Sequence, residues 1–307
     1  MKRIIYSKST AGLVAAALAT AIVISPASAS FEGVPGRLAF ASDVGNGADI
    51  YTVMPDGQAL HQLTDFAGFD ACPSYSPDGK YIAWCSGTAP VFEIWVMKQN
   101  GTGKRQVTDL GGSSTFPKFS PDGETLAFAH RPVGLTYDIY TVNVDGTGLT
   151  QLTTEPVDDV NPAVSPDGST IAFLSRRTGI YQVWLMDIDG ANQRQLTFDP
   201  VPKDQLPDWS PDGTKIVYTA GSGTAFGGDI EVVDADGSNA VRLTATADLE
   251  FGPTWSPDGS KIAYVQIHGT SRKLHVMNAD GTGDVALGVP GLHFVPTWQP
   301  RGDRLDG

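Results

Sequence analysis

Six positions of this 307-residue chain combine reactive residue types with a regular spacing. Each stands three residues before a proline, at intervals of 43 to 46 residues: Asp70, Ser114, Asp159, Asp204, Glu250 and His293. Four carboxylates gathered with one imidazole would repel one another, and would therefore raise their pKa values, recruit a cation or stay well hydrated. Oxygen-rich sites suit Ca²⁺, and an added imidazole would permit a transition metal. The structural alternative is that these side chains bond to nearby loop backbone.

These positions sit inside a repeat that is marked by the tetrapeptide Ser-Pro-Asp-Gly. It occurs five times, with steps of 44, 45, 45 and 46 residues, at Ser76–Gly79, Ser120–Gly123, Ser165–Gly168, Ser210–Gly213 and Ser256–Gly259. Proline and aspartate suit the two central positions of a tight turn, and glycine takes the left-handed conformation that closes a bulged hairpin. Each copy therefore predicts a strand, a turn and a second strand.

A second turn completes each repeat. It is an Asp-Gly or Asn-Gly pair that begins at Asp56, Asn100, Asp145, Asp189, Asp236 and Asp280. Four short strands in a repeat of this size are typical of one blade of a β-propeller. The segment 37–40 resembles a second strand without a first, and 296–302 resembles a first strand with nothing after it. We therefore predict an all-β, six-bladed propeller, with four antiparallel strands per blade, closed by pairing of the C-terminal strand with the N-terminal blade.

The frame Pro-x-Trp-Ser-Pro-Asp-Gly-x-x-Ile-Ala-Phe resembles the PD40 (WD40-like) repeat of the TolB propeller, over roughly residues 36 to 303. The resemblance implies a six-bladed fold that serves chiefly in interactions, and it does not settle function. TolB itself carries an α/β domain ahead of its propeller, and no such domain fits between Ser30 and Arg37. Translocation by the Tol system is therefore not inferred.

The N-terminus has the layout of a secretory signal peptide, which we assign to residues 1–29. A basic start containing Lys2, Arg3 and Lys8 precedes the apolar stretch 11–24, and 27–29 reads Ala-Ser-Ala. The apolar stretch is shorter than the roughly 20 residues that span a bilayer. We expect a secreted, periplasmic or cell-envelope protein without a membrane span after cleavage, with residues 30–307 forming the propeller.

The chain is acidic. Its formal net charge is −13, and removal of the three basic residues of the leader makes it −16. Such a surface repels nucleic acid and anionic membranes and favours cations or basic partners. We expect a monomer that binds no nucleic acid.

The two cysteines, Cys72 and Cys85, flank the turn at 76–79 almost symmetrically. Hairpin pairing would place them nearly opposite each other, and export favours oxidation. We expect a cross-strand disulfide; two buried free thiols are the alternative.

Both turns of the repeat lie on one face of the predicted ring, which we call the repeat-turn face. The other connections, from second to third strand and from fourth to the next first strand, vary in length and lie on the opposite face, which we call the variable face. Specificity is usually built on such variable loops. We place ligand binding at the six channel-mouth positions on this face, and recognition at loop residues Arg131, Tyr137, Arg176, Arg177 and Tyr181.

The sequence favours an exported binding or scaffold module that engages a protein or a cell-envelope glycan through the variable face and the channel mouth. No Gly-x-Ser-x-Gly elbow or phosphate-binding loop is present, so no catalytic residue is assigned. The alternative is a hydrolase or lyase with a Ca²⁺-like metal at the channel mouth. Its ligands or general acid and base would be Asp70, Asp159, Asp204, Glu250 and His293. Apart from that ion, no cofactor is predicted.

Overall fold

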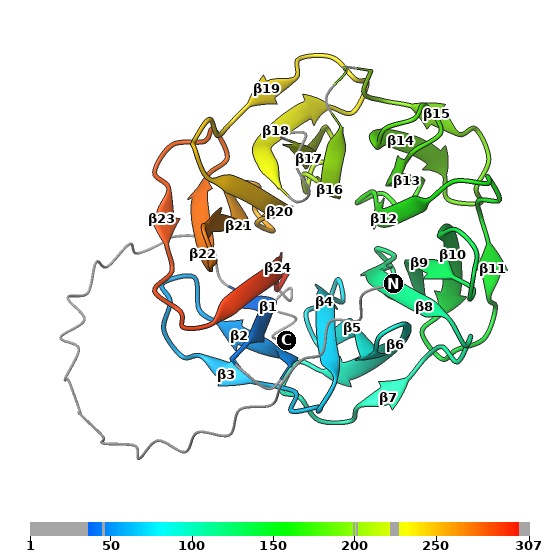
Figure 1. Ribbon diagram of the computed structural model, residues 1–307, viewed down its shortest axis with the longest axis horizontal. Coiled ribbons are helices and arrows are strands. Elements are labelled where there is room, and N and C mark those ends of the chain that lie inside the picture. The colour runs from blue at the N-terminus through cyan, green and yellow to red at the C-terminus, as the bar shows by residue number, and fades with distance from the viewer. Residues whose placement is uncertain (1–35, 45–46, 199, 201, 222–226, 301–307) are drawn as a thin grey trace, which may run out of the picture.

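The computed structural model describes residues 36–44, 47–198, 200, 202–221 and 227–300. Within these ranges the chain forms 24 strands and no helix. The strands make six four-stranded antiparallel blades around a central axis (Figure 1). The prediction of an all-β, six-bladed propeller is confirmed. The signal peptide predicted for residues 1–29 lies outside the described residues.

The strands are arranged as follows, from the axis outward in each blade. Blade 1 contains β24 (Leu292–Trp298), β1 (Leu38–Asp43), β2 (Ala48–Val53) and β3 (His61–Gln62). Blade 2 contains β4 (Phe69–Tyr75), β5 (Tyr81–Thr88), β6 (Val91–Lys98) and β7 (Arg105–Gln106). Blade 3 contains β8 (Ser113–Phe119), β9 (Thr125–Arg131), β10 (Asp138–Asn143) and β11 (Thr150–Gln151).

The second half of the ring repeats the same order. Blade 4 contains β12 (Asp159–Val164), β13 (Thr170–Ser175), β14 (Gln182–Asp187) and β15 (Arg194–Gln195). Blade 5 contains β16 (Lys203–Trp209), β17 (Lys215–Gly221), β18 (Gly228–Asp234) and β19 (Val241–Arg242). Blade 6 contains β20 (Leu249–Trp255), β21 (Lys261–His268), β22 (Ser271–Asn278) and β23 (Val285–Ala286).

The ring closes where β24 pairs antiparallel with β1. Leu38 faces Trp298 in this pairing, and Ser42 faces His293. Gln299, which stands where the other repeats have serine, extends the contact because its backbone N–H donates to Arg37 O at 2.8 Å. Its side-chain amide also donates to Gly79 O at 3.1 Å, which ties blade 1 to the first turn of blade 2. The closure therefore pairs the edge of β1 and completes blade 1 with a fourth strand.

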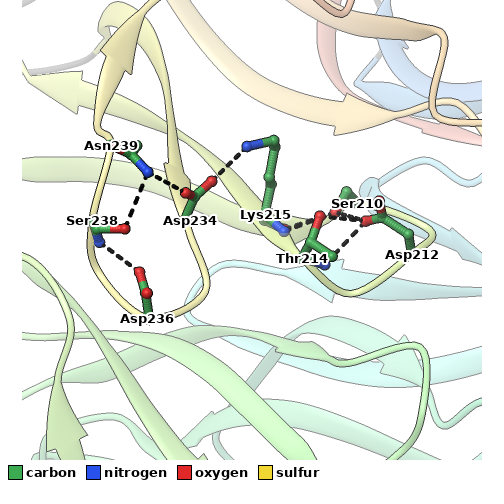
Figure 2. A network of polar contacts seen from close by, with 8 residues as sticks. All are labelled: Ser210, Asp212, Thr214, Lys215, Asp234, Asp236, Ser238 and Asn239. Atoms are coloured by element: carbon green, nitrogen blue, oxygen red, sulfur yellow. Dashed lines mark hydrogen bonds and ion pairs between the residues drawn. The ribbon is translucent and has the colours of Figure 1, made fainter.

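The Ser-Pro-Asp-Gly turns are held by one repeated set of hydrogen bonds. In blade 5 the Ser210 hydroxyl donates to the Asp212 carboxylate at 2.7 Å and accepts from the Lys215 backbone at 2.9 Å (Figure 2). The neighbouring turn of the same blade is joined to it by the ion pair between Lys215 and Asp234. Both turns thus lie side by side on the repeat-turn face, as predicted. The hydrogen bond from Ser210 lowers the pKa of Asp212, and Asp78, Asp122 and Asp167 are shifted alike in their own turns.

Every innermost strand carries a β-bulge just before its proline. On β4, Ala71 pairs with Cys85 and Ser74 pairs with Ala83, so two residues of β4 face Trp84 alone. The residue before the proline has a positive φ in all six blades: Cys72 (56°), Phe116 (54°), Asn161 (55°), Leu206 (34°), Gly252 (63°) and Val295 (27°). Proline has no N–H to donate, and the bulge places it where the ladder needs none.

The core lies between neighbouring blades. Large aromatic residues of the second strands are almost fully buried, and they pack on the small residues of the preceding blade. Phe40 and Tyr51 of blade 1, for example, cluster with Ala263 and Val265 of blade 6. Each blade therefore depends on its neighbours for burial, and the six form one cooperative unit.

The expected disulfide is not present: Cys72 and Cys85 are free and buried. The bulge explains the difference, because it takes Cys72 out of register and pairs Cys85 with Ala71 instead. The Cys85 thiol donates to Ala71 O at 3.2 Å. Burial raises the pKa of Cys85 well above its ordinary value, so this thiol is poorly reactive in the native protein.

We predict that both thiols react with an alkylating reagent only after unfolding. The native protein should gain no mass with iodoacetamide, and the denatured, unreduced protein should gain two adducts. Intact mass spectrometry makes the measurement. If the denatured protein gains adducts only after reduction, the cysteines form a disulfide in solution and the register described here is wrong.

A second prediction concerns closure. A chain that ends at Pro290 lacks β24, which exposes the edge of β1 and the Phe40 side of blade 1. We expect it to aggregate or to lose its cooperative melting transition, measured by light scattering and circular dichroism. The chain shortened only after Pro300 serves as the control and should melt like the full protein. A monomeric, equally stable 1–290 chain would contradict the closed ring.

Candidate functional site

The predicted channel-mouth residues are buried between blades and do not line an open mouth. Asp70 is 2% exposed, and the exposed fraction is 0% for Ser114, Asp159, Glu250 and His293. The side chain of Asp204 lies outside the described residues. The contacts explain the burial: Ser114 reaches Glu93 of blade 2 and Glu250 reaches Thr244 of blade 5, so both side chains are covered by the preceding blade. The prediction of an exposed ring at the channel mouth is therefore wrong for the five described positions.

Three of these residues, Ser114, Asp159 and Glu250, contact a hydrogen-bonded arrangement that recurs between blades and that we call the threonine latch. In blade 2, Thr108 Oγ1 accepts from the Ile94 N–H at 2.9 Å and donates to Glu93 at 2.6 Å. The same carboxylate accepts from the backbone of the connection to blade 3 and, at 3.3 Å, from Ser114. Equivalent threonines accept from strand backbone in four further blades: Thr64, Thr153, Thr197 and Thr244. The latch holds each outgoing connection against its blade.

The side chains at these positions have different partners in different blades. Glu250 accepts from Thr246 at 2.6 Å and from Thr244 at 3.1 Å, and its burial raises its pKa. Asp159 forms an ion pair of 2.7 Å with Arg177, although burial still raises the pKa of Asp159. His293 bonds through Nε2 to Val289 O at 2.9 Å, and burial lowers its pKa. The described part of the chain contains no group of three or more His, Cys, Asp or Glu side chains that could hold a metal ion.

The predicted recognition residues do lie on the variable face, and they form two cation–π pairs. The Arg131 guanidinium lies 4.6 Å from the Tyr137 ring centroid in blade 3, and that of Arg176 lies 5.3 Å from Tyr181 in blade 4. Asp158 joins the two pairs, since it accepts from the Tyr137 N–H at 3.0 Å and from the Tyr181 hydroxyl at 3.5 Å. Arg177 is different, because its side chain is only 14% exposed and is engaged in the ion pair with Asp159.

Two exposed apolar residues adjoin the first of these pairs. Val133 is 79% exposed and Leu135 is 66% exposed, in the loop between β9 and β10. We call Arg131, Val133, Leu135, Tyr137, Arg176 and Tyr181 the blade 3–4 patch. It combines exposed apolar area with arginine and tyrosine, the composition of energetic centres in protein interfaces.

The variable face also contains a cavity between blades 1 and 2, of about 620 Å³. We call it the blade 1–2 cavity; its lining includes Phe66, Asp70, Trp84, Ser86, Glu93, Trp95, Lys104 and Gln106. The Asp70 Oδ1 and Trp84 Nε1 atoms are buried and have no hydrogen-bond partner among the described residues. The sequence analysis predicted that Asp70 lies on this face. The regular spacing of the six positions did not indicate that the cavity would lie at blade 2.

A second opening, which the sequence analysis did not predict, lies on the repeat-turn face. It has a volume of about 430 Å³ and is lined by the proline of every turn: Pro77, Pro121, Pro166, Pro211, Pro257 and Pro300. Lys118 of blade 3 approaches Asp208 of blade 5 inside it, with 3.8 Å between Nζ and Oδ1. The repeated Pro-x-aromatic-Ser-Pro frame was the available signal, because it places one proline per blade around the axis.

Comparisons with known proteins agree with this architecture. The family described as the TolB beta propeller domain (PD40) matches residues 93–229. TolB from Acinetobacter baumannii is similar in structure, with a TM-score of 0.76 and 24% identity over 88% of this chain and 69% of that chain. Hydrazine synthase from Kuenenia stuttgartiensis matches with a TM-score of 0.74 and 19% identity, over 87% of this chain and 47% of that one.

A nidogen–laminin complex also contains this fold, with a TM-score of 0.71 and 13% identity over 86% of this chain and 98% of that one. No curated protein matches the sequence. The blade count, the closure and the turns define a six-bladed β-propeller. Within this ring, residues 93–229 match the family of the TolB beta propeller domain (PD40), and the ring is similar in fold to the propellers of TolB proteins.

Asp138, an acid of the latch in blade 3, allows a test by pH. It accepts from Thr153 at 3.2 Å and from Gln151 at 3.0 Å, while burial and, secondarily, repulsion from Asp159 raise its pKa to about 6. A folded pKa above the unfolded value of 3.8 means that stability is fully present below that value and is lost as the pH rises through about 6.

We predict that the unfolding free energy of the wild type, relative to Asp138→Asn, falls by about 1–2 kcal/mol between pH 4 and pH 7, after allowance for solvent screening. Urea denaturation across that range makes the measurement, and the range is extended below pH 4 for the control. Asp167→Asn is the control with the opposite sign. Hydrogen bonding from Ser165 lowers the pKa of Asp167, so the wild type should gain relative to this variant as the pH rises from acid. A flat difference for Asp138→Asn would refute the raised pKa.

Proposed function

We propose that the protein is an exported binding module that engages a protein or a cell-envelope ligand through its variable face. The observation that carries the proposal is the blade 3–4 patch, where exposed Val133 and Leu135 adjoin the Arg131–Tyr137 pair. An arginine stacked on a tyrosine is already ordered, so less side-chain entropy is lost when a partner binds. Such an arrangement suits the centre of an interface.

Export rests on the leader-like layout of residues 1–29, and a location in the periplasm or the cell envelope is part of the proposal. The described residues contain no helix that is long and apolar enough to cross a membrane. The negative charge of the whole chain supports protein or glycan partners over nucleic acid.

The metal-dependent hydrolase or lyase has less support. Its proposed ligands occupy different seams, where Asp159 is paired with Arg177 and Glu250 with two threonines. No specific observation favours it.

The proposal predicts that Val133→Asp and Leu135→Asp each weaken binding of the purified protein to isolated cell envelopes by about tenfold, the equivalent of 1.4 kcal/mol. Leu149→Asp is the matched control, because Leu149 is an apolar residue of the same blade, 44% exposed, next to a turn of the repeat-turn face. Saturation binding of labelled protein is the measurement. Equal affinity of all three variants would remove the blade 3–4 patch as the binding surface.

A further inference from the structure

We propose that the blade 1–2 cavity is a binding site for an uncharged sugar ring, of the kind that forms neutral or N-acetylated cell-envelope glycans. This inference rests on the proposed function and adds a ligand class and a second location on the same face. It is drawn from two buried polar atoms, an aromatic wall and the charges around the cavity.

Of the two atoms without a hydrogen-bond partner, one is an acceptor and the other is a donor. Asp70 Oδ1 can only accept when the carboxyl group is ionised, and Trp84 Nε1 can only donate. Both side chains are 2% exposed, and leaving such groups unpaired costs about 1–3 kcal/mol each. Hydroxyl groups of a sugar can serve both atoms, since a hydroxyl group can donate to a carboxylate and can accept from an indole N–H. An ammonium group would satisfy Asp70 alone and would leave the indole N–H unpaired.

The walls of the cavity are arranged in two rows by the strand register. Asp70, Ser86 and Glu93 face one another across β4, β5 and β6, and form a polar row. Trp84 and Trp95 form the next row, with ring centroids 6.1 Å apart and planes at 35°. An aromatic wall beside a row of hydroxyl and carboxylate groups matches the apolar face and the hydroxyl edge of a pyranose. The volume of about 620 Å³ is ample for one such ring or two.

The remaining polar groups restrict the charge of the ligand. Glu93 is occupied by Thr108, by Ser114 and by the backbone of Leu110 and Gly111, so it acts as fixed negative charge and not as a free acceptor. Asp65 adds an exposed carboxylate to the rim. Lys104 also lines the cavity, but its Nζ donates to Gly101 O at 2.8 Å, and three carboxylates, those of Asp65, Asp70 and Glu93, stand against this one cation. An anionic sugar such as a uronate would therefore be repelled.

Blade 4 also has an aspartate Oδ1 and an indole Nε1 that are buried without a hydrogen-bond partner among the described residues, in Asp159 and Trp184, but it lacks the open space beside them. Trp184 of blade 4 occupies the position of Trp95, and it faces Phe173 where blade 2 has Trp84. There Arg177 lies over both aromatic rings and pairs with Asp159, so the equivalent space is filled by the protein itself. Blade 4 therefore supplies a matched control for each residue of the site.

The test uses the mature full-length protein on an array of neutral, N-acetylated and uronate oligosaccharides, followed by calorimetric titration of the glycan that binds most tightly. We expect neutral or N-acetylated glycans to bind and uronates not to bind. Asp70→Asn and Trp95→Ala should each weaken binding at least about tenfold, and Trp184→Ala should leave it unchanged. Ser86→Ala removes less packing than Trp95→Ala and should also weaken binding. Ser175→Ala, the equivalent change in blade 4, should not. Melting curves check that each variant is folded.

The outcomes separate the two proposals. Binding of uronates alone, binding of no glycan, or neutral-glycan binding that is insensitive to Asp70→Asn and Trp95→Ala would overturn the sugar site. Each of these results leaves the envelope-binding test with Val133→Asp and Leu135→Asp intact. Failure of that test, with glycan binding lost in the blade 2 variants, would overturn the patch and retain the cavity.

Discussion

The pairing of β24 with β1 is the contact on which the rest of the molecule depends. Short blades of four strands bury little surface alone, and each presents one face of large residues to the small residues of its neighbour. Only a closed ring gives all six blades two neighbours. The side chain of Gln299, which reaches both Arg37 and Gly79, joins the last strand to the first two blades at once. Every seam, including the blade 1–2 cavity, takes its shape from that closure.

The fold could be predicted because its signals are local and repeated. A Ser-Pro-Asp-Gly turn fixes a hairpin whatever surrounds it, as the hydrogen bonds of Ser210 and Asp212 illustrate. Five copies at even intervals then define the blade, and the unmatched ends define the closure. The placement of the turns on one face followed from strand order alone.

The site was predicted less well than the fold, because no residue type marks the β-bulges or the direction of the side chains on the innermost strands. The bulge residues Cys72, Phe116 and Asn161 share a left-handed backbone but no side-chain chemistry. The bulge displaced Cys72 from Cys85, and the orientation of the innermost strands turned Asp70 and Glu250 into the seams. The loop residues were placed correctly, since connection length and position suffice for that. Neighbouring side chains fill the space between blades differently in each blade, and this decides where polar atoms stay unpaired beside an open space. The spacing of the repeat carries no information about that filling.

The negative charge of the repeat turns is insensitive to mild acid. The aspartates of the repeat turns, such as Asp78 and Asp122, are exposed, and hydrogen bonds within their turns keep their pKa values low. Arg131 and Arg176 lie on the opposite side of the ring. Mild acid that protonates Asp138, whose pKa is about 6, leaves the aspartates of the repeat turns ionised, so the repeat-turn face keeps its negative charge.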